Sequence, residues 1–268
     1  MAWNFDFTSF EYVPGKTLLS DYPTVFAVIV AYLVVVFGLP RLLKHSPPFQ
    51  LHLLFQLHNY FLSLVSLVLL VALAQALVPR LLQHGLLWGV CSADVFVDQR
   101  LNFYFYINYL LKYYELLDTL FLILKKKKTE FLHVYHHSLT VLLCVIQLNG
   151  NTTVQWVPIG LNLLVHTVMY YYYGRTATGA KLWWKKYLTS MQITQFVIDL
   201  IAIYSAMYIR HAYDHGLPSP VQGSCHGDLR AGWFGTYLLS SYLYLFIEFF
   251  WKTYISRRKG AQLKSKSM

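Results

Sequence analysis

The sequence predicts an all-α polytopic membrane protein with seven transmembrane helices. Of its 268 residues, 56% are hydrophobic and 13% are charged, whereas soluble domains carry about 25% charged residues. Its apolar runs reach the roughly 20 residues that a helix needs to cross a bilayer. We place spans at residues 24–43, 53–78, 101–124, 131–149, 154–173, 188–209 and 233–254. Since little sequence remains outside them, residues 1–268 are interpreted as a single membrane domain.

The distribution of basic residues orients these spans. The first span follows Asp6, Glu11 and Asp21, without the basic segment of a removable signal peptide, so we expect it to be retained. An odd number of spans places the termini on opposite sides of the membrane. Sixteen of the 22 Lys and Arg residues fall on the C-terminal side, five on the other side and Lys112 inside a span. The positive-inside rule therefore predicts a lumenal N-terminus and a cytosolic C-terminus.

The termini and loops indicate the compartment. Lys264 and Lys266, in a cytosolic basic tail at residues 260–268, resemble the dilysine signal that returns membrane proteins to the endoplasmic reticulum, although an ordinary basic tail would look the same. Cys91 and Cys225 both fall in lumenal loops, where we expect a disulfide, and Cys144 is expected to be free. Because topology explains the net charge of +10, no nucleic-acid partner is expected, and membrane lipid is the expected surrounding.

The third span carries polar residues that packing does not require. Lys112, Glu115, Asp118 and Thr119 are spaced so that they share one helix face. Each charge at membrane depth costs about 2.5–3.5 kcal/mol. The stripe therefore predicts a water-filled or catalytic cavity, with a self-compensating charge ladder between helices as the alternative.

The next three spans add polar groups at a similar depth. Asp118, His136, His166 and Gln195 each lie seven to nine residues from the cytosolic end of their span, or about 10–14 Å along a helix. A shared depth indicates one pocket. The polar set in these spans comprises the histidine box His133, His136 and His137, then Asn162 and His166 followed by Tyr170 and Tyr173, and finally Gln192 and Gln195. The tyrosine stripe has a second interpretation, as an interfacial belt.

These blocks, in order and spacing, resemble the ELO-type very-long-chain fatty acid elongases, and most of all the fungal members. The resemblance covers residues 101–200 densely and includes Trp183-Trp184-Lys185-Lys186 ahead of Gln192. It implies a condensing acyltransferase that joins long-chain acyl-CoA and malonyl-CoA into 3-ketoacyl-CoA, releasing CoA and CO2. It also implies a fold in which six of the seven helices enclose an acyl tunnel, and partnership with the reductases and dehydratase of the elongation cycle.

The residue types suggest how such a reaction proceeds. No cysteine is suitably placed to carry the acyl group, whereas histidine can form covalent intermediates. We therefore expect His136 to be acylated and His166 to stabilise the enolate or pass a proton. The expected donors to oxyanions are His133, His137, Asn162, Gln192 and Gln195. Glu115 and Asp118 would fix imidazole tautomers and Lys112 would balance their charge. Lys185, Lys186, Tyr170 and Tyr173 are expected to bind substrate, with no cofactor and no metal.

Two other functions fit parts of the pattern. Membrane di-iron desaturases and hydroxylases also use His-x-x-His-His boxes, but they need about eight histidine ligands and several histidines here fall on the lumenal side. A proton-coupled transporter would explain the charged stripe of the third span as a proton relay.

Overall fold

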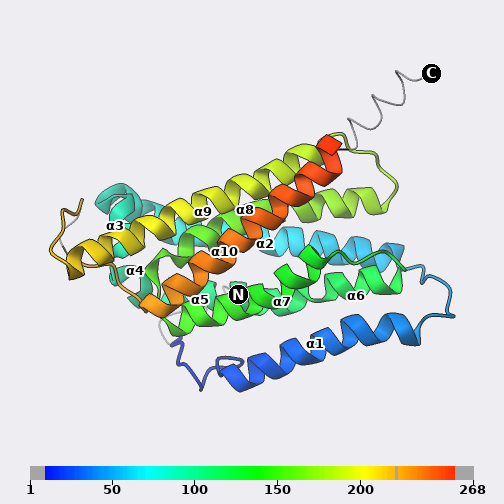
Figure 1. Ribbon diagram of the computed structural model, residues 1–268, viewed down its shortest axis with the longest axis horizontal. Helices are drawn as coiled ribbons and strands as arrows, with labels where there is room; N and C mark the ends of the chain where they lie inside the picture. The colour runs from blue at the N-terminus through cyan, green and yellow to red at the C-terminus, as the bar shows by residue number, and fades with distance from the viewer. Residues whose placement is uncertain (1–9, 221–222, 257–268) are drawn as a thin grey trace, which may run out of the picture.

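The structure is a computed structural model that describes residues 10–220 and 223–256, and every regular element in these ranges is helical. Figure 1 shows the long helices lying side by side in an elongated bundle. The elements are α1 (Tyr22–Leu42), α2 (His52–His84), α3 (Leu86–Cys91), α4 (Asp94–Val97), α5 (Gln99–Glu115), α6 (Leu117–Leu124), α7 (Phe131–Asn149), η2 (Thr153–Gln155), α8 (Trp156–Ala177), α9 (Lys185–Asp214), α10 (Leu229–Phe250) and the π-helical η3 (Trp251–Ser256).

Each predicted span is helical in large part, but the number of membrane crossings stays a prediction. By length and composition, four helices among the described residues qualify as membrane spans, namely α1, α2, α7 and α9. The others are interrupted or more polar, because α5 stops at Glu115 and α8 contains Asn162, His166 and a run of tyrosines. The chain is therefore a multi-pass membrane protein.

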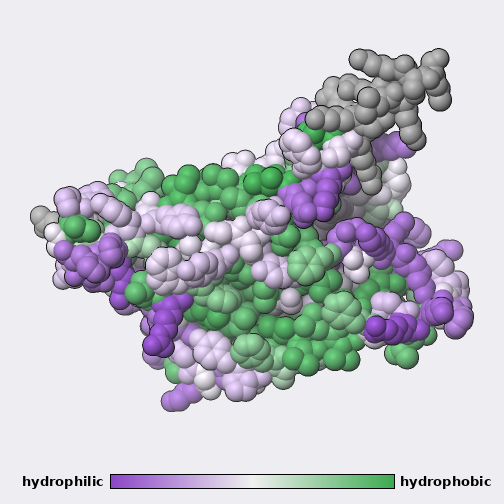
Figure 2. All heavy atoms as spheres, viewed as in Figure 1, coloured by the Kyte–Doolittle hydropathy of each residue, from purple (hydrophilic) through white to green (hydrophobic). Residues whose placement is uncertain are grey.

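The surface matches this interpretation. Figure 2 shows hydrophobic residues across the middle of the molecule and hydrophilic residues gathered at its two ends. On α1, Val30, Val34 and Phe37 are exposed, and Leu64 and Val68 are exposed on α2. Rows of exposed aliphatic side chains at mid-helix are stable when lipid surrounds them.

The predicted third span differs from a continuous helix. It is divided at Leu116, whose backbone N–H bonds to the carbonyl of Tyr113 at 3.2 Å, three residues back. Such a tight turn within a helix often marks a functional site or a hinge. Here it lies between Glu115 and Asp118, so the charged stripe is bent instead of straight.

Close packing joins α2 to α8. A Cβ added at Gly174 of α8 would lie 2.6 Å from Cε1 of Tyr60 on α2, which is closer than real Cβ contacts. Glycine at this position therefore lets the two backbones approach. The approach brings His58 of α2 near the polar residues of α8 and α6.

The end of the bundle where α7 meets η2 and α8 is fastened covalently. A disulfide joins Cys91 of α3 to Cys225 ahead of α10, as predicted, and Cys144 is free. The segment at residues 10–21 covers the same end, because Tyr12 donates to Asn149 Oδ1 at 2.7 Å and Tyr109 donates to the carbonyl of Leu19 at 2.6 Å. The expected retention residues Lys264 and Lys266 lie outside the described residues.

Candidate functional site

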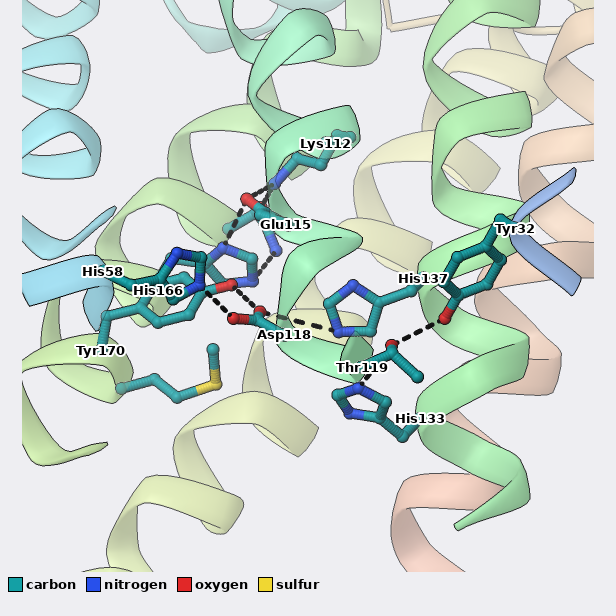
Figure 3. A network of polar contacts seen from close by, with 12 residues as sticks. Tyr32, His58, Lys112, Glu115, Asp118, Thr119, His133, His137, His166 and Tyr170 are labelled. Atoms are coloured by element: carbon teal, nitrogen blue, oxygen red, sulfur yellow. Dashed lines mark hydrogen bonds and ion pairs between the residues drawn. The ribbon is translucent and has the colours of Figure 1, made fainter. Parts of the chain in front are cut away.

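Four side chains from α5 and α8 form a closed polar ring (Figure 3). Lys112 Nζ donates to Glu115 Oε1 at 2.8 Å and to Asn162 Oδ1 at 2.7 Å. His166 Nδ1 lies 3.1 Å from the same carboxylate oxygen, and Asn162 Nδ2 lies 3.1 Å from His166 Nε2. The predicted stripe of α5 therefore meets the predicted pair of α8.

The ring determines where the proton of His166 resides. Because Lys112 has no acceptor atom, the Asn162 atom it contacts must be the amide oxygen. The amide nitrogen then donates to His166 Nε2, so the histidine proton lies on Nδ1 and is donated to Glu115.

Because the ring is buried, each of its charges depends on its partner inside the ring. Lys112 and Glu115 are 3% and 2% exposed and His166 is 5% exposed. Removing one partner of a buried ion pair leaves an uncompensated charge, which is far worse than replacing both partners. The predicted role of Lys112 as a counter-charge agrees with this geometry.

A second group surrounds Asp118 of α6. Its Oδ1 lies 2.6 Å from Nε2 of His58, and its Oδ2 accepts a hydrogen bond from the hydroxyl of Tyr170 at 2.7 Å. His137 Nε2 lies 4.0 Å from the same carboxylate. Since the Tyr170 hydroxyl is used here, its geometry favours orienting Asp118 over contacting a substrate.

A third group links α1 to the histidine box. The Thr119 hydroxyl lies 2.7 Å from the Tyr32 hydroxyl and 3.0 Å from His133 Nε2. His133 and His137 lie against each other with ring centroids 4.3 Å apart. Two of the three box histidines thus face α6 and its polar residues.

His136 points in another direction. Its ring is perpendicular to that of His137 and lies 4.7 Å from the ring of Tyr242 on α10. Within the described residues, no hydrogen bond engages its Nδ1, which is buried. Among the described residues, His136 is therefore the box histidine whose ring makes aromatic contacts but neither a hydrogen bond nor an ion pair.

His136 lines a mostly apolar cavity, and the space between its walls that no atom fills is about 580 Å³, part of which is open to solvent. Lys112, Asn162 and Gln195 lie in the same wall, and apolar side chains from α5 to α10 form most of the rest. These are Phe105, Leu143, Leu148, Pro158, Ile159, Phe196 and Leu239. The cavity thus combines an imidazole and hydrogen-bond donors with space for a hydrocarbon chain.

Ten of the predicted catalytic and substrate-binding residues lie outside the lining of this cavity, and four of them, Gln192, Tyr173, Lys185 and Lys186, also lie outside the three polar groups described above. Gln192 donates to the sulfur of Met169 at 3.4 Å, and Tyr173 packs its partly exposed ring against Tyr172. Lys185 and Lys186 are exposed at the start of α9, where Lys186 lies over the ring of Phe250 at 5.5 Å. Their substrate contacts stay predictions.

The structure adds three residues that the sequence pattern did not single out. Tyr32 and His58 bring α1 and α2 into the polar groups. Asp199 is fully buried and accepts from Gln195 at 3.4 Å. The sequence could have indicated Asp199, because it lies seven residues after Gln192 and four after Gln195 and so shares their helix face. Within the residues that the structure describes, no cluster of three or more His, Cys, Asp or Glu side chains is arranged to hold a metal ion.

Comparisons with known proteins relate nearly the whole chain to one family. The ELO model, described as the GNS1/SUR4 family, matches residues 17–262. The chain is 46% identical over 257 residues to a putative fatty acid elongase 1 of Schizosaccharomyces pombe, covering 96% of this chain and 76% of that protein. It is 36% identical to fatty acid elongase A of Dictyostelium discoideum, over 88% of this chain and 83% of that one. It is 31% identical to long chain fatty acid elongase 2 of Caenorhabditis elegans, with 88% and 85% covered.

The buried pair predicts strongly non-additive mutational effects. Lys112→Met alone leaves Glu115 buried without its counter-charge and should lower the free energy of unfolding by about 3–5 kcal/mol. The double variant Lys112→Met with Glu115→Gln should lose clearly less than the sum of the two single losses. Chemical unfolding in detergent micelles measures these values.

An exposed ion pair supplies the control for that experiment. Lys128 Nζ lies 3.1 Å from Glu130 Oε1, with the lysine side chain 82% exposed. Lys128→Met should change the free energy of unfolding by less than about 1 kcal/mol. Simple additivity of the losses at Lys112 and Glu115 would contradict the buried-pair account.

Proposed function

The chain belongs to the ELO family and is a condensing enzyme of fatty acid elongation; from this premise we propose that it joins long-chain acyl-CoA to malonyl-CoA through an acyl-imidazole on His136. The products are 3-ketoacyl-CoA, free CoA and CO2. The single observation that carries the proposed nucleophile is the placement of His136, which alone among the box histidines lines the apolar cavity.

In the first half-reaction, a His136 ring nitrogen attacks the thioester carbon of acyl-CoA. The new C–N bond replaces the C–S bond, CoA leaves as a thiolate, and the remaining ring proton passes to its sulfur. Histidine is among the side chains that form covalent intermediates. The unengaged Nδ1 supports this role, because a nucleophile needs a free lone pair.

In the second half-reaction, malonyl-CoA loses CO2 and the electron pair remains as an enolate. The enolate carbon attacks the acyl carbon, the C–N bond breaks, and the departing imidazolate of His136 takes up one proton from solvent, which is the proton that the overall reaction consumes. No cofactor is needed in this scheme, because decarboxylation itself generates the carbanion. Stabilisation of the enolate and of the tetrahedral oxyanion is then the main task of the protein.

The polar ring and the Asp118 group supply that stabilisation. In this proposal His166 keeps its Nδ1 proton on Glu115 and acts through Nε2, which takes up a second proton and then stabilises the enolate or passes that proton on. Asn162 and Gln195 donate from the cavity wall. His133 and His137, together with Gln192, are the remaining proposed donors.

The cytosolic rim is the proposed site for CoA. The basic residues there suit its phosphates electrostatically. Lys125 lies 4.0 Å over the ring of Phe55 and is partly desolvated, which lowers its pKa. We propose Lys185 and Lys186 as CoA contacts, with Tyr173 near the entrance and Tyr170 acting through Asp118.

We also propose the topology that this chemistry requires. Seven spans place the N-terminus in the lumen of the endoplasmic reticulum and the C-terminus in the cytosol, and six of the helices enclose the cavity as an acyl tunnel. The tail would act as a retention signal, and the product would pass to the reductases and dehydratase of the elongation cycle. The gathering of CoA-compatible lysines at one end of the bundle supports this orientation.

Intact-mass measurement tests the nucleophile. After incubation of purified protein with a long-chain acyl-CoA and no malonyl-CoA, we expect one acyl group on each protein and one free CoA. His136→Ala should abolish both. Addition of malonyl-CoA should discharge the adduct as 3-ketoacyl-CoA with release of CO2.

Cys144→Ala is the matched control, because this free thiol lines the same cavity two helical turns from His136. The adduct should still form in this variant. Loss of the adduct only in Cys144→Ala would assign the acyl group to the thiol. If neither adduct nor CoA appears until malonyl-CoA is added, condensation is direct and the proposed intermediate is wrong.

Protease protection tests the orientation. In sealed microsomes, a tag at the C-terminus should be digested, while a tag at the N-terminus should be protected until detergent is added. Antibody detection of each tag measures both outcomes. Equal protection of the two tags would indicate an even number of spans, and reversed protection would invert the positive-inside assignment.

A further inference from the structure

Two side-chain oxygens in the cavity wall have no hydrogen-bond partner among the described residues. They are Oδ1 of Asp199 on α9 and Oδ1 of Asn108 on α5. The two residues are 0% and 2% exposed, so bulk water does not reach them through the protein surface. A buried acceptor without a donor is destabilising, which indicates that a donor arrives from the cavity.

Apart from His136, the proposed nucleophile, the other polar side chains of the wall are already paired. Gln147 donates to a backbone carbonyl of α10 at 2.7 Å, and Gln155 donates to the carbonyl of Thr152 at 2.8 Å. The hydroxyls of Thr140 and Tyr242 lie 3.1 Å apart. Hydrogen bonds within the protein therefore account for these polar side chains, but not for the unpaired oxygens of Asp199 and Asn108.

Asp199 lies beyond the reacting end of the cavity. Its Oδ2 accepts a long hydrogen bond of 3.4 Å from Gln195, which shares the cavity wall with His136. Asp199 follows Gln195 by one helical turn, about 6 Å along α9. The carboxyl therefore faces the part of the cavity that an acyl chain would occupy, and not the thioester.

We propose that Asp199 Oδ1 accepts a hydrogen bond from a hydroxyl group on the acyl chain, in a subsite whose wall also includes Asn108, so that the enzyme elongates hydroxylated acyl-CoA substrates. This inference rests on the proposed function, because it requires the acyl chain to occupy the cavity behind His136. A carboxyl group accepts a hydrogen bond in either protonation state, and a hydroxyl donates one. A bound water could supply the same donor, and the experiment distinguishes the two sources.

The subsite should determine how strongly the enzyme prefers a hydroxylated acyl chain over an unsubstituted one. A site built to bond a substrate hydroxyl discriminates against the analogue without it, because its buried polar groups are then left unpaired. An aliphatic side chain at position 199 removes that discrimination and favours a hydrocarbon chain. The ratio of kcat/KM for a hydroxylated chain to kcat/KM for the matched unsubstituted chain reports this change independently of the amount of active enzyme.

The test measures this ratio in full-length protein for a series of long-chain acyl-CoA substrates with the hydroxyl at different carbons. For at least one position, Asp199→Leu should lower the ratio about 10- to 100-fold, the range expected for losing a hydrogen bond to a carboxyl group. Asp199→Asn keeps an acceptor oxygen and should hold the ratio within about threefold. If Asp199→Leu does not fold, Asn108→Leu is measured with the expectation of a lower ratio.

Asp214→Leu is the matched control, because Asp214 is an exposed acidic residue at the C-terminal end of α9, fifteen residues beyond Asp199. It should leave the ratio unchanged. An equal ratio in wild type and Asp199→Leu at every hydroxyl position would overturn the inference and leave water as the donor. Wild-type protein that elongates only unsubstituted chains would also overturn it while supporting the proposed function. Failure of wild type to elongate any chain would overturn both.

Discussion

The buried ion pair between Lys112 and Glu115 is the constraint on which the rest of the site depends. Within a bundle surrounded by lipid, neither charge has water to solvate it, so each needs its partner at a fixed distance. Asn162 and His166 complete the ring and thereby draw α8 against α5. The turn at Leu116 then directs Asp118 to a separate set of partners instead of adding a third charge to the ring.

The histidine box is divided between two tasks, because two of its histidines are held as oriented donors and the third faces the cavity. His133 lies beside Thr119 and His137 lies beside Asp118, both on α6. His136 instead turns toward the cavity and the aromatic residues of α10. A condensing enzyme needs both conditions, because oriented donors must stay rigid while the nucleophile keeps a free lone pair. The cavity wall extends to Gln147, Leu148 and Gln155, near the end of the bundle that the disulfide fastens.

The sequence allowed accurate prediction wherever local periodicity decides the outcome. Apolar runs located the long helices, whereas the expectation that Asp118, His136, His166 and Gln195 lie at one depth in a single pocket stays a prediction. Contacts between distant segments were not predictable. The direction of His136 depends on its packing against Tyr242, and the partner of Asp118 is His58 on α2, sixty residues earlier. The turn at Leu116 also escaped prediction, because no Gly or Pro marks it.

A structure of the protein incubated with a long-chain acyl-CoA tests the central claim most directly. The account predicts continuous density between a ring nitrogen of His136 and the acyl carbonyl carbon, with the hydrocarbon chain between Leu143 and Leu239 in the cavity. The Lys112, Glu115, Asn162 and His166 ring should remain intact beside it. A chain bound in any other groove, or carried by another residue, would contradict the account.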